Sequence, residues 1–200
     1  HRLTALVRAN VSAVLLVVRG LDPRAREVID TGRARSIADN LRLNGHAHSA
    51  QLTAIANAIC WLEWGRGLGS VRAVEAKIEQ YKADFDWAET CLMRKEPLLR
   101  APITSAMVYA RQLNPPKLDD FVRAYLSGTG LGVDSPVYLL REFVTRHSKG
   151  STNREVQLKA LRAVEAFCDG VTMRKLYASE ETLGRVVGRL GRTARKFSTD

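Results

Sequence analysis

Five basic side chains near the C-terminal end of the chain have the pattern of a phosphate-binding surface. They are Arg185, Arg189, Arg192, Arg195 and Lys196. Four of them follow one another at intervals of four, three and four residues, which places them along one face of a helix. Such a row can neutralise DNA phosphates without reading bases. The pattern also suits a solvated tail, or an amphipathic helix that docks on a partner or a membrane surface.

A second polar group is the Asp-x-Gly-x-x-Arg turn formed by Asp30, Gly32 and Arg35. Asp30 and Arg35 can form a polar site there. They can also be structural, with Asp30 capping the turn, Gly32 at positive φ and Arg35 paired with Asp30. We favour the structural interpretation.

Two patterns resemble metal-ligand sets. His46 and His48 have His-x-His spacing, which can bind zinc, but no third ligand is near in the sequence. Asp84, Asp86 and Glu89 can cluster on a helix face. Solvated surface residues explain both patterns more simply, so we expect no metal site. Catalytic residues are not assigned, because the sequence contains no Ser-His-Asp set, Walker loop or His-Glu-x-x-His motif.

The composition of the chain limits the classes of partner and the compartment that we expect for it. The formal net charge is +10, which favours a polyanion such as DNA, RNA or anionic lipid. The longest apolar run, Ala13–Val18, is far too short to span a membrane. Three widely spaced cysteines fit a reducing compartment, and we expect a cytoplasmic protein.

Periodicity predicts a mainly α-helical chain. A β-branched run at Val14–Val18 predicts one buried strand after a short helix, and Asp22-Pro23 predicts a helix start. Such a strand cannot form a sheet alone, so its partners must lie upstream or in another chain. Further helices are expected at 36–43, from Ser49 as N-cap, and at 71–81, 85–93, 102–113, 118–126, 135–147, 155–168 and 180–197.

Residues 36–59 also have the outline of a helix-turn-helix unit, with Gly45 in the turn. Its second helix carries the apolar stripe Leu52, Ile55, Ala56, Ile59 and Leu62, and no Arg or Lys lies between His48 and Arg66. A recognition helix presents polar and basic side chains to base edges. We therefore interpret this helix as a core element.

Several motifs at compatible spacing resemble phage- and plasmid-associated ParB-like proteins. The chain starts with His-Arg-Leu-Thr-Ala-Leu, similar to the end of a Gly-x-His-Arg signature, and the strand and acidic turn of residues 14–22 follow it. Residues 29–39, 127–131, 135–141 and 158–160 add further matches, so the resemblance spans most of residues 1–178. The sulfiredoxin fold is related, but its cysteine has no counterpart here.

The resemblance implies a division into the end of a ParB/sulfiredoxin-type α/β domain at 1–30 and a multi-helix domain at 31–178. A basic amphipathic tail at 179–200 lies beyond the resemblance. The resemblance further implies that His1 and Arg2 contact nucleotide phosphates near a helix N-terminus. A nucleoside triphosphate would bind in a complete N-terminal domain.

Three functions remain open. The first is a DNA-associated accessory protein of a phage or plasmid that binds mainly through phosphate contacts. The second is a nucleotide hydrolase or nuclease of the same fold, which rests on resemblance alone. The third is a non-catalytic module that binds a protein partner or another copy of itself, for which the loop at Gly128–Gly132 and the amphipathic tail are suited.

Overall fold

The computed structural model describes residues 7–10, 12, 14, 19–20, 22, 36–93, 96–177, 179, 181, 183–186 and 188. The chain divides into two compact units, His1–Ala34 and Arg35–Asp200. In the first unit, residues 7–9 form a single helical turn. The strand expected at Val14–Val18 and the helix expected after Pro23 fall largely outside the described residues. The tail helix expected at 180–197 is described in part.

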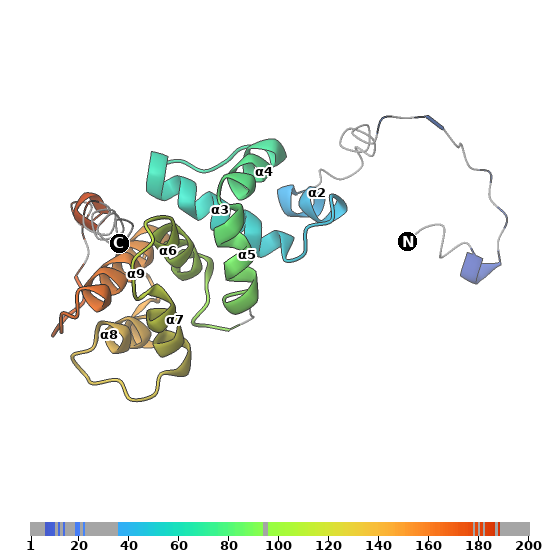
Figure 1. Cartoon of the computed structure of the whole chain (residues 1–200). Coiled ribbons are helices and arrows are strands. Elements are labelled where there is room, and N and C mark those ends of the chain that lie inside the picture. The colour runs from blue at the N-terminus through green and yellow to red at the C-terminus, as the bar shows by residue number, and fades with distance from the viewer. Residues whose placement is uncertain are drawn as a thin grey trace. The chain divides into compact units, whose positions relative to one another are not determined.

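The second unit confirms the prediction of a mainly helical chain (Figure 1), and its described residues contain no strand. Its elements are α2 (Ile37–Leu43), α3 (Ser49–Trp64), α4 (Val71–Gln80), α5 (Lys82–Cys91), α6 (Ala101–Gln112), α7 (Leu118–Ser127), α8 (Pro136–Glu142), the π-helical turn η2 (Phe143–His147) and α9 (Asn153–Cys168).

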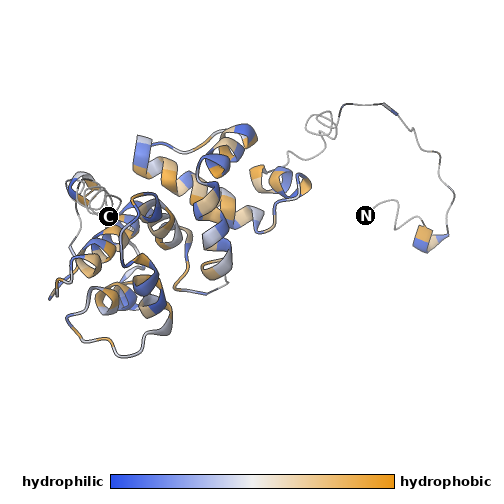
Figure 2. Ribbon diagram, viewed as in Figure 1, coloured by the Kyte–Doolittle hydropathy of each residue, from blue (hydrophilic) through white to orange (hydrophobic). Residues whose placement is uncertain are grey.

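Helices α6 and α9 form the centre of this unit. They pack against each other, α3 packs on α6, and α7 and α8 pack on α9. In Figure 1, α2–α5 gather on one side of the α6–α9 pair and α7 and α8 on the other. Each helix carries both apolar and polar residues along its length (Figure 2), and the apolar ones supply a continuous buried core. Burial of these apolar faces, more than helix propensity, stabilises such short helices.

Local signals explain most helix starts. Ser36 and Asp39 form the expected capping box before α2: Asp39 N–H donates to Ser36 Oγ, and Ser36 N–H donates to the Asp39 carboxylate. The expected cap of α3 is wrong, because Ser49 is already helical. The N-cap is His48, which adopts a left-handed conformation and whose carbonyl accepts from Leu52 N–H, the first helical bond.

The helix expected at 135–147 changes form before its end. It is α-helical to Glu142 and continues as η2, a wider turn that closes i→i+5 bonds. Side-chain hydroxyls take up backbone carbonyls here: Thr145 Oγ1 donates to Arg141 O at 2.9 Å, and Ser148 Oγ donates to Val144 O at 2.7 Å. Single π-turns of this kind occur frequently at functional sites.

The glycine-rich segment after α7 has a structural role at its first position. Gly128 ends α7 in a left-handed conformation with φ 66°. Arg141 reaches across from α8 and donates to the carbonyls of Tyr125 and Leu126, which lie in the last turn of α7 and have no donor within the helix. The guanidinium therefore occupies the space beside Gly128.

This arrangement makes Gly128→Ala more destabilising than Gly130→Ala. Both glycines have positive φ, so each alanine costs about 1–2 kcal/mol in backbone strain. A Cβ at Gly128 would also lie 2.5 Å from Arg141 Nη2, whereas one at Gly130 meets nothing within 4 Å. Urea unfolding followed by circular dichroism should show a loss at least about 1 kcal/mol larger for Gly128→Ala. Equal losses would contradict this role of Arg141.

Candidate functional site

A pocket of about 440 Å³ lies where α8, η2 and the start of α9 meet the segment that follows α9. We call it the basic pocket. Its lining residues are Leu139, Glu142, Phe143, His147, Ser151, Glu155, Lys159, Arg174, Lys175 and Leu176. Because η2 contributes both Phe143 and His147, the π-helical turn shapes one wall.

One wall of the basic pocket is apolar and holds a neutralised lysine. Lys159 Nζ lies 3.8 Å from the centroid of the Phe143 ring and 2.8 Å from Glu155 Oε1. The hydrogen bond from Lys159 lowers the pKa of Glu155, so the carboxylate stays charged and the ion pair persists. Lys159 and Glu155 therefore contribute little net charge to the pocket.

The remaining charge at the pocket is positive. Glu142 is engaged by Arg146, with 3.2 Å between Oε1 and Nη1. Arg174 and Lys175 are exposed, and neither makes an ion pair with any residue that the structure describes. Lys175 Nζ lies 4.8 Å from the Tyr177 ring centroid, which positions the ammonium without neutralising it. The pocket thus presents two cations that no carboxylate among the described residues offsets.

The start of α9 borders the basic pocket through Glu155 in its first turn and Ser151, which precedes its N-cap. Thr152 caps this helix, and its side chain accepts from Glu155 N–H at 3.1 Å. The N–H groups of Asn153 and Arg154 belong to the first turn and have no intrahelical acceptor. These donors and the positive end of the helix dipole favour an anion at the same edge as Arg174 and Lys175.

The structure places one of the five basic residues expected to contact phosphate. Arg185 is about half exposed, and its Nε lies 3.9 Å from Oε1 of the fully buried Glu165. Arg162 also pairs with Glu165. The charge of Arg185 is thus partly neutralised by a buried carboxylate. Arg189, Arg192, Arg195 and Lys196 lie outside the described residues, as do His1, Arg2, Asp30 and Arg35.

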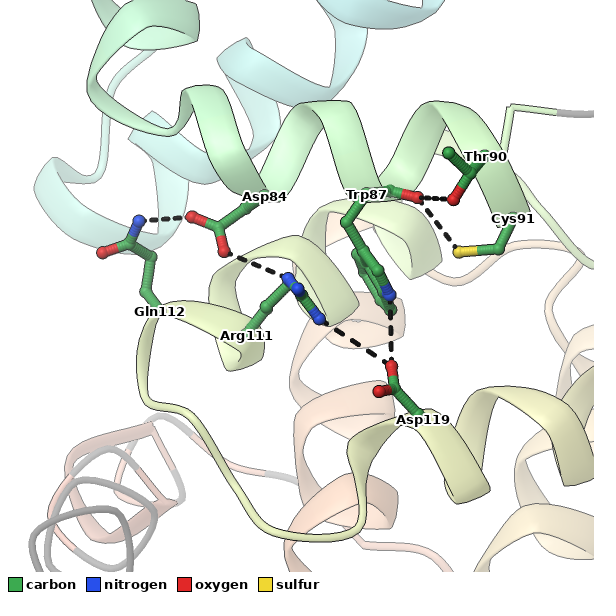
Figure 3. A network of polar contacts seen from close by, with 7 residues as sticks. All are labelled: Asp84, Trp87, Thr90, Cys91, Arg111, Gln112 and Asp119. Atoms are coloured by element: carbon green, nitrogen blue, oxygen red, sulfur yellow. Dashed lines mark hydrogen bonds and ion pairs between the residues drawn. The ribbon is translucent and has the colours of Figure 1, made fainter. Parts of the chain in front are cut away.

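The possible metal clusters do not form among the described residues. Figure 3 shows that Asp84 instead turns toward α6, where it accepts from Gln112 and pairs with Arg111 at 3.5 Å. Arg111 also stacks on Trp87, whose Nε1 donates to Asp119 at 3.1 Å. Asp84 is therefore a buried link between α5 and α6. His46 and His48 lie in the turn before α3, as expected for surface residues.

Two of the three cysteines are poor nucleophiles in this environment. Burial raises the pKa of Cys168 to about 11 and also raises the pKa of the fully buried Cys60. At neutral pH both thiols are protonated, as is usual for cysteines that act as small apolar residues. None of the three cysteines forms a disulfide.

Comparisons of the chain with protein-family models, with curated protein sequences and with solved structures give no match. The resemblance to ParB-like proteins stays a prediction. None of the helices formed by the described residues is long and apolar enough to cross a membrane.

Sequence reasoning missed the basic pocket. Its walls come from α8, η2, α9 and the segment after α9, and only the Arg174-Lys175 doublet is visible as a local signal. Which lysines are neutralised depends on contacts such as Lys159 with Glu155, which the fold creates.

Proposed function

We propose that this chain is a DNA-associated protein that binds DNA mainly through phosphate contacts, like the phage- and plasmid-associated ParB-like proteins that its sequence resembles. The observation that carries the proposal is the pair of cations Arg174 and Lys175 at the basic pocket, beside the first turn of α9. Arginine can grip a phosphate with two donors, lysine adds a point charge, and the helix N-terminus adds backbone donors.

The distribution of charge supports several phosphate contacts along the chain. Residues 36–177 contain 19 Lys and Arg against 15 Asp and Glu, so they hold +4 of the total of +10. The segments on either side hold the other +6. Most of the attraction toward a polyanion therefore comes from the flanks, and the basic pocket is a local contact on a weakly basic helical unit.

The test is fluorescence anisotropy of a labelled 20-base-pair duplex with the full chain across a salt series. We expect the dissociation constant to rise steeply with salt, because binding releases counterions. Arg174→Ala and Lys175→Ala should each weaken binding about 3- to 10-fold and reduce the salt slope by about one.

Arg123→Ala is the matched control. Arg123 is exposed on α7 and pairs with Asp120 at 3.0 Å, and it does not line the basic pocket. Removing this charge should change affinity less than twofold. Equal losses in all three variants would show that net charge, and not the basic pocket, determines binding. No binding of DNA at low salt would overturn the proposal.

A further inference from the structure

A second cavity, of about 770 Å³, lies between α3 and the starts of α6 and α9. We call it the Trp61 cavity. One face of α3 lines it at helical spacing, with Ala54, Asn57, Ala58 and Trp61. The opposite face of α3 carries the apolar stripe that packs in the core, so one face of this helix is buried and the other borders a cavity. The sequence interpretation of α3 as purely a core element is therefore incomplete.

The walls of the Trp61 cavity form a slot beside one aromatic ring. Ala54, Ala58 and Ala101 project only methyl groups, which leaves the space open. Trp61 is 51% exposed although it is the largest side chain on this face. A half-exposed indole beside small residues suits a flat ring that stacks on it.

Gln157 contributes a polar atom to this slot, and its orientation is determined by its partners. The side chain is 1% exposed, and its Nε2 donates to Ala58 O and to Ser105 Oγ, each at 2.8 Å. A carbonyl oxygen only accepts, so the amide nitrogen must face Ala58 O. Ser105 Oγ donates to Pro102 O at 3.0 Å and is thus free to accept from Gln157.

Both amide hydrogens of Gln157 are therefore used, and Oε1 is the end that it offers to the cavity. Within the described part of the chain, Oε1 accepts no hydrogen bond. Gln157 Oε1 is not among the buried atoms that lack a partner, so water can reach it, and a ligand that carries a donor can take the place of that water. The cavity thus favours a ligand that has a planar ring and an N–H or O–H donor.

One basic side chain borders the Trp61 cavity. Arg154 is the one charged residue among those that line it, and its Nη1 donates to Trp61 O at 2.6 Å, which ties α9 to the end of α3. Asn153 and Arg154 occupy the first turn of α9, whose backbone donors favour an anion.

The two pockets border different faces of the chain at the start of α9. Ser151 and Glu155 border the basic pocket, whereas Asn153, Arg154 and Gln157 border the Trp61 cavity. Asn153 and Arg154 themselves line the Trp61 cavity, so a phosphate held at the first turn of α9 lies beside this cavity. A ligand with a flat ring attached to a phosphate chain matches this arrangement.

We infer that the Trp61 cavity binds one unpaired base of single-stranded DNA, an inference that rests on the proposed DNA association. The base stacks on the Trp61 indole, donates an N–H to Gln157 Oε1, and its phosphate lies at the first turn of α9 beside Arg154. All four bases carry an N–H and a stacking face, so sequence preference is weak.

Anisotropy titrations of the full chain with a labelled 12-nucleotide single strand test this inference. The comparison strand has the same length and charge but lacks bases. We expect the abasic strand and the Trp61→Ala variant each to bind about tenfold more weakly, within the range for loss of one base–aromatic stack. Ala54→Leu, which fills the slot from an exposed position and leaves Trp61 in place, should give a similar loss.

Trp64→Ala is the matched control, because Trp64 is 55% exposed on the same helix and does not line the cavity. It should bind the single strand like the unchanged protein. If abasic and normal strands bind alike, or if Trp61→Ala and Ala54→Leu bind normally, the inference falls while DNA association stands. If free deoxyadenosine monophosphate binds as tightly as the strand, the cavity is a nucleotide site and the inference is again wrong. If neither single-stranded nor duplex DNA binds at low salt, the proposed function itself fails.

Discussion

Glu63→Ala should lower the free energy of unfolding by about 3–5 kcal/mol, the usual cost of removing one partner from a buried ion pair. Lys77 is 2% exposed, and its Nζ lies 2.7 Å from Glu63 Oε2. Without the carboxylate, the ammonium would remain buried with one neutral acceptor, Gln80 Oε1 at 2.7 Å, and the ring of Trp64 at 4.2 Å.

Glu63 also holds Tyr81 at the junction of α4 and α5. The Tyr81 hydroxyl donates to the carboxylate, and burial together with this hydrogen bond raises the pKa of Tyr81. The hydroxyl therefore stays protonated and keeps donating at any ordinary pH. Glu63→Ala removes this bond as well, which places the expected loss toward the upper part of the range.

Urea unfolding followed by circular dichroism at 222 nm measures the effect. Glu63→Gln keeps the shape and one acceptor, so its loss should be smaller than that of Glu63→Ala. The double variant Glu63→Leu/Lys77→Met replaces both charges with apolar groups and should recover most of the stability. A loss below about 1 kcal/mol for Glu63→Ala, in the range of exposed pairs, would contradict the burial of this pair.

Phe121→Ala should cost about 3–5 kcal/mol, because it removes a fully buried ring from the contact of α7 with α9. The Phe121 ring meets Phe167 edge-on at 5.5 Å between centroids and stacks with Tyr125 at 6.1 Å. Truncation opens a cavity and removes both aromatic contacts. The same urea titration measures the loss.

Two variants calibrate the Phe121 result. Phe121→Leu keeps much of the volume and should cost less than about 1.5 kcal/mol. Tyr177→Ala removes a ring that is 67% exposed and should change stability by less than about 0.5 kcal/mol. If Phe121→Ala behaves like Tyr177→Ala, α7 does not pack on α9 as described.

Local patterns predicted the helical part of the fold well. Ser36 with Asp39, Pro102, Pro136 and Gly170 mark boundaries through capping and backbone restrictions, which act within a few residues. The apolar stripe of α3 correctly predicted its buried face. The cap at His48 and the π-turn at Phe143–His147 were missed, because each depends on how the chain packs beyond the local turn.

The residues of the candidate sites, unlike the helix boundaries, depended on contacts with distant segments. Asp84 appeared as a surface acid by spacing, yet Arg111 and Gln112 of α6 draw it inside. Gln157 carried no signal at all. Its importance comes from Ala58 and Ser105, which lie 99 and 52 residues away in the sequence.

By itself, the sequence determined the helical class, most helix boundaries and the basic character of the chain, since propensity, capping and composition are local or additive. The tertiary structure decided which charges lack an ion pair within the described part of the chain, as at Arg174 and Lys175, and which are neutralised, as at Lys159 and Lys77. It also decided that Trp61 and Gln157 share one cavity. These outcomes depend on contacts between distant segments, and ion pairing, burial and the orientation of an amide arise only when such segments meet.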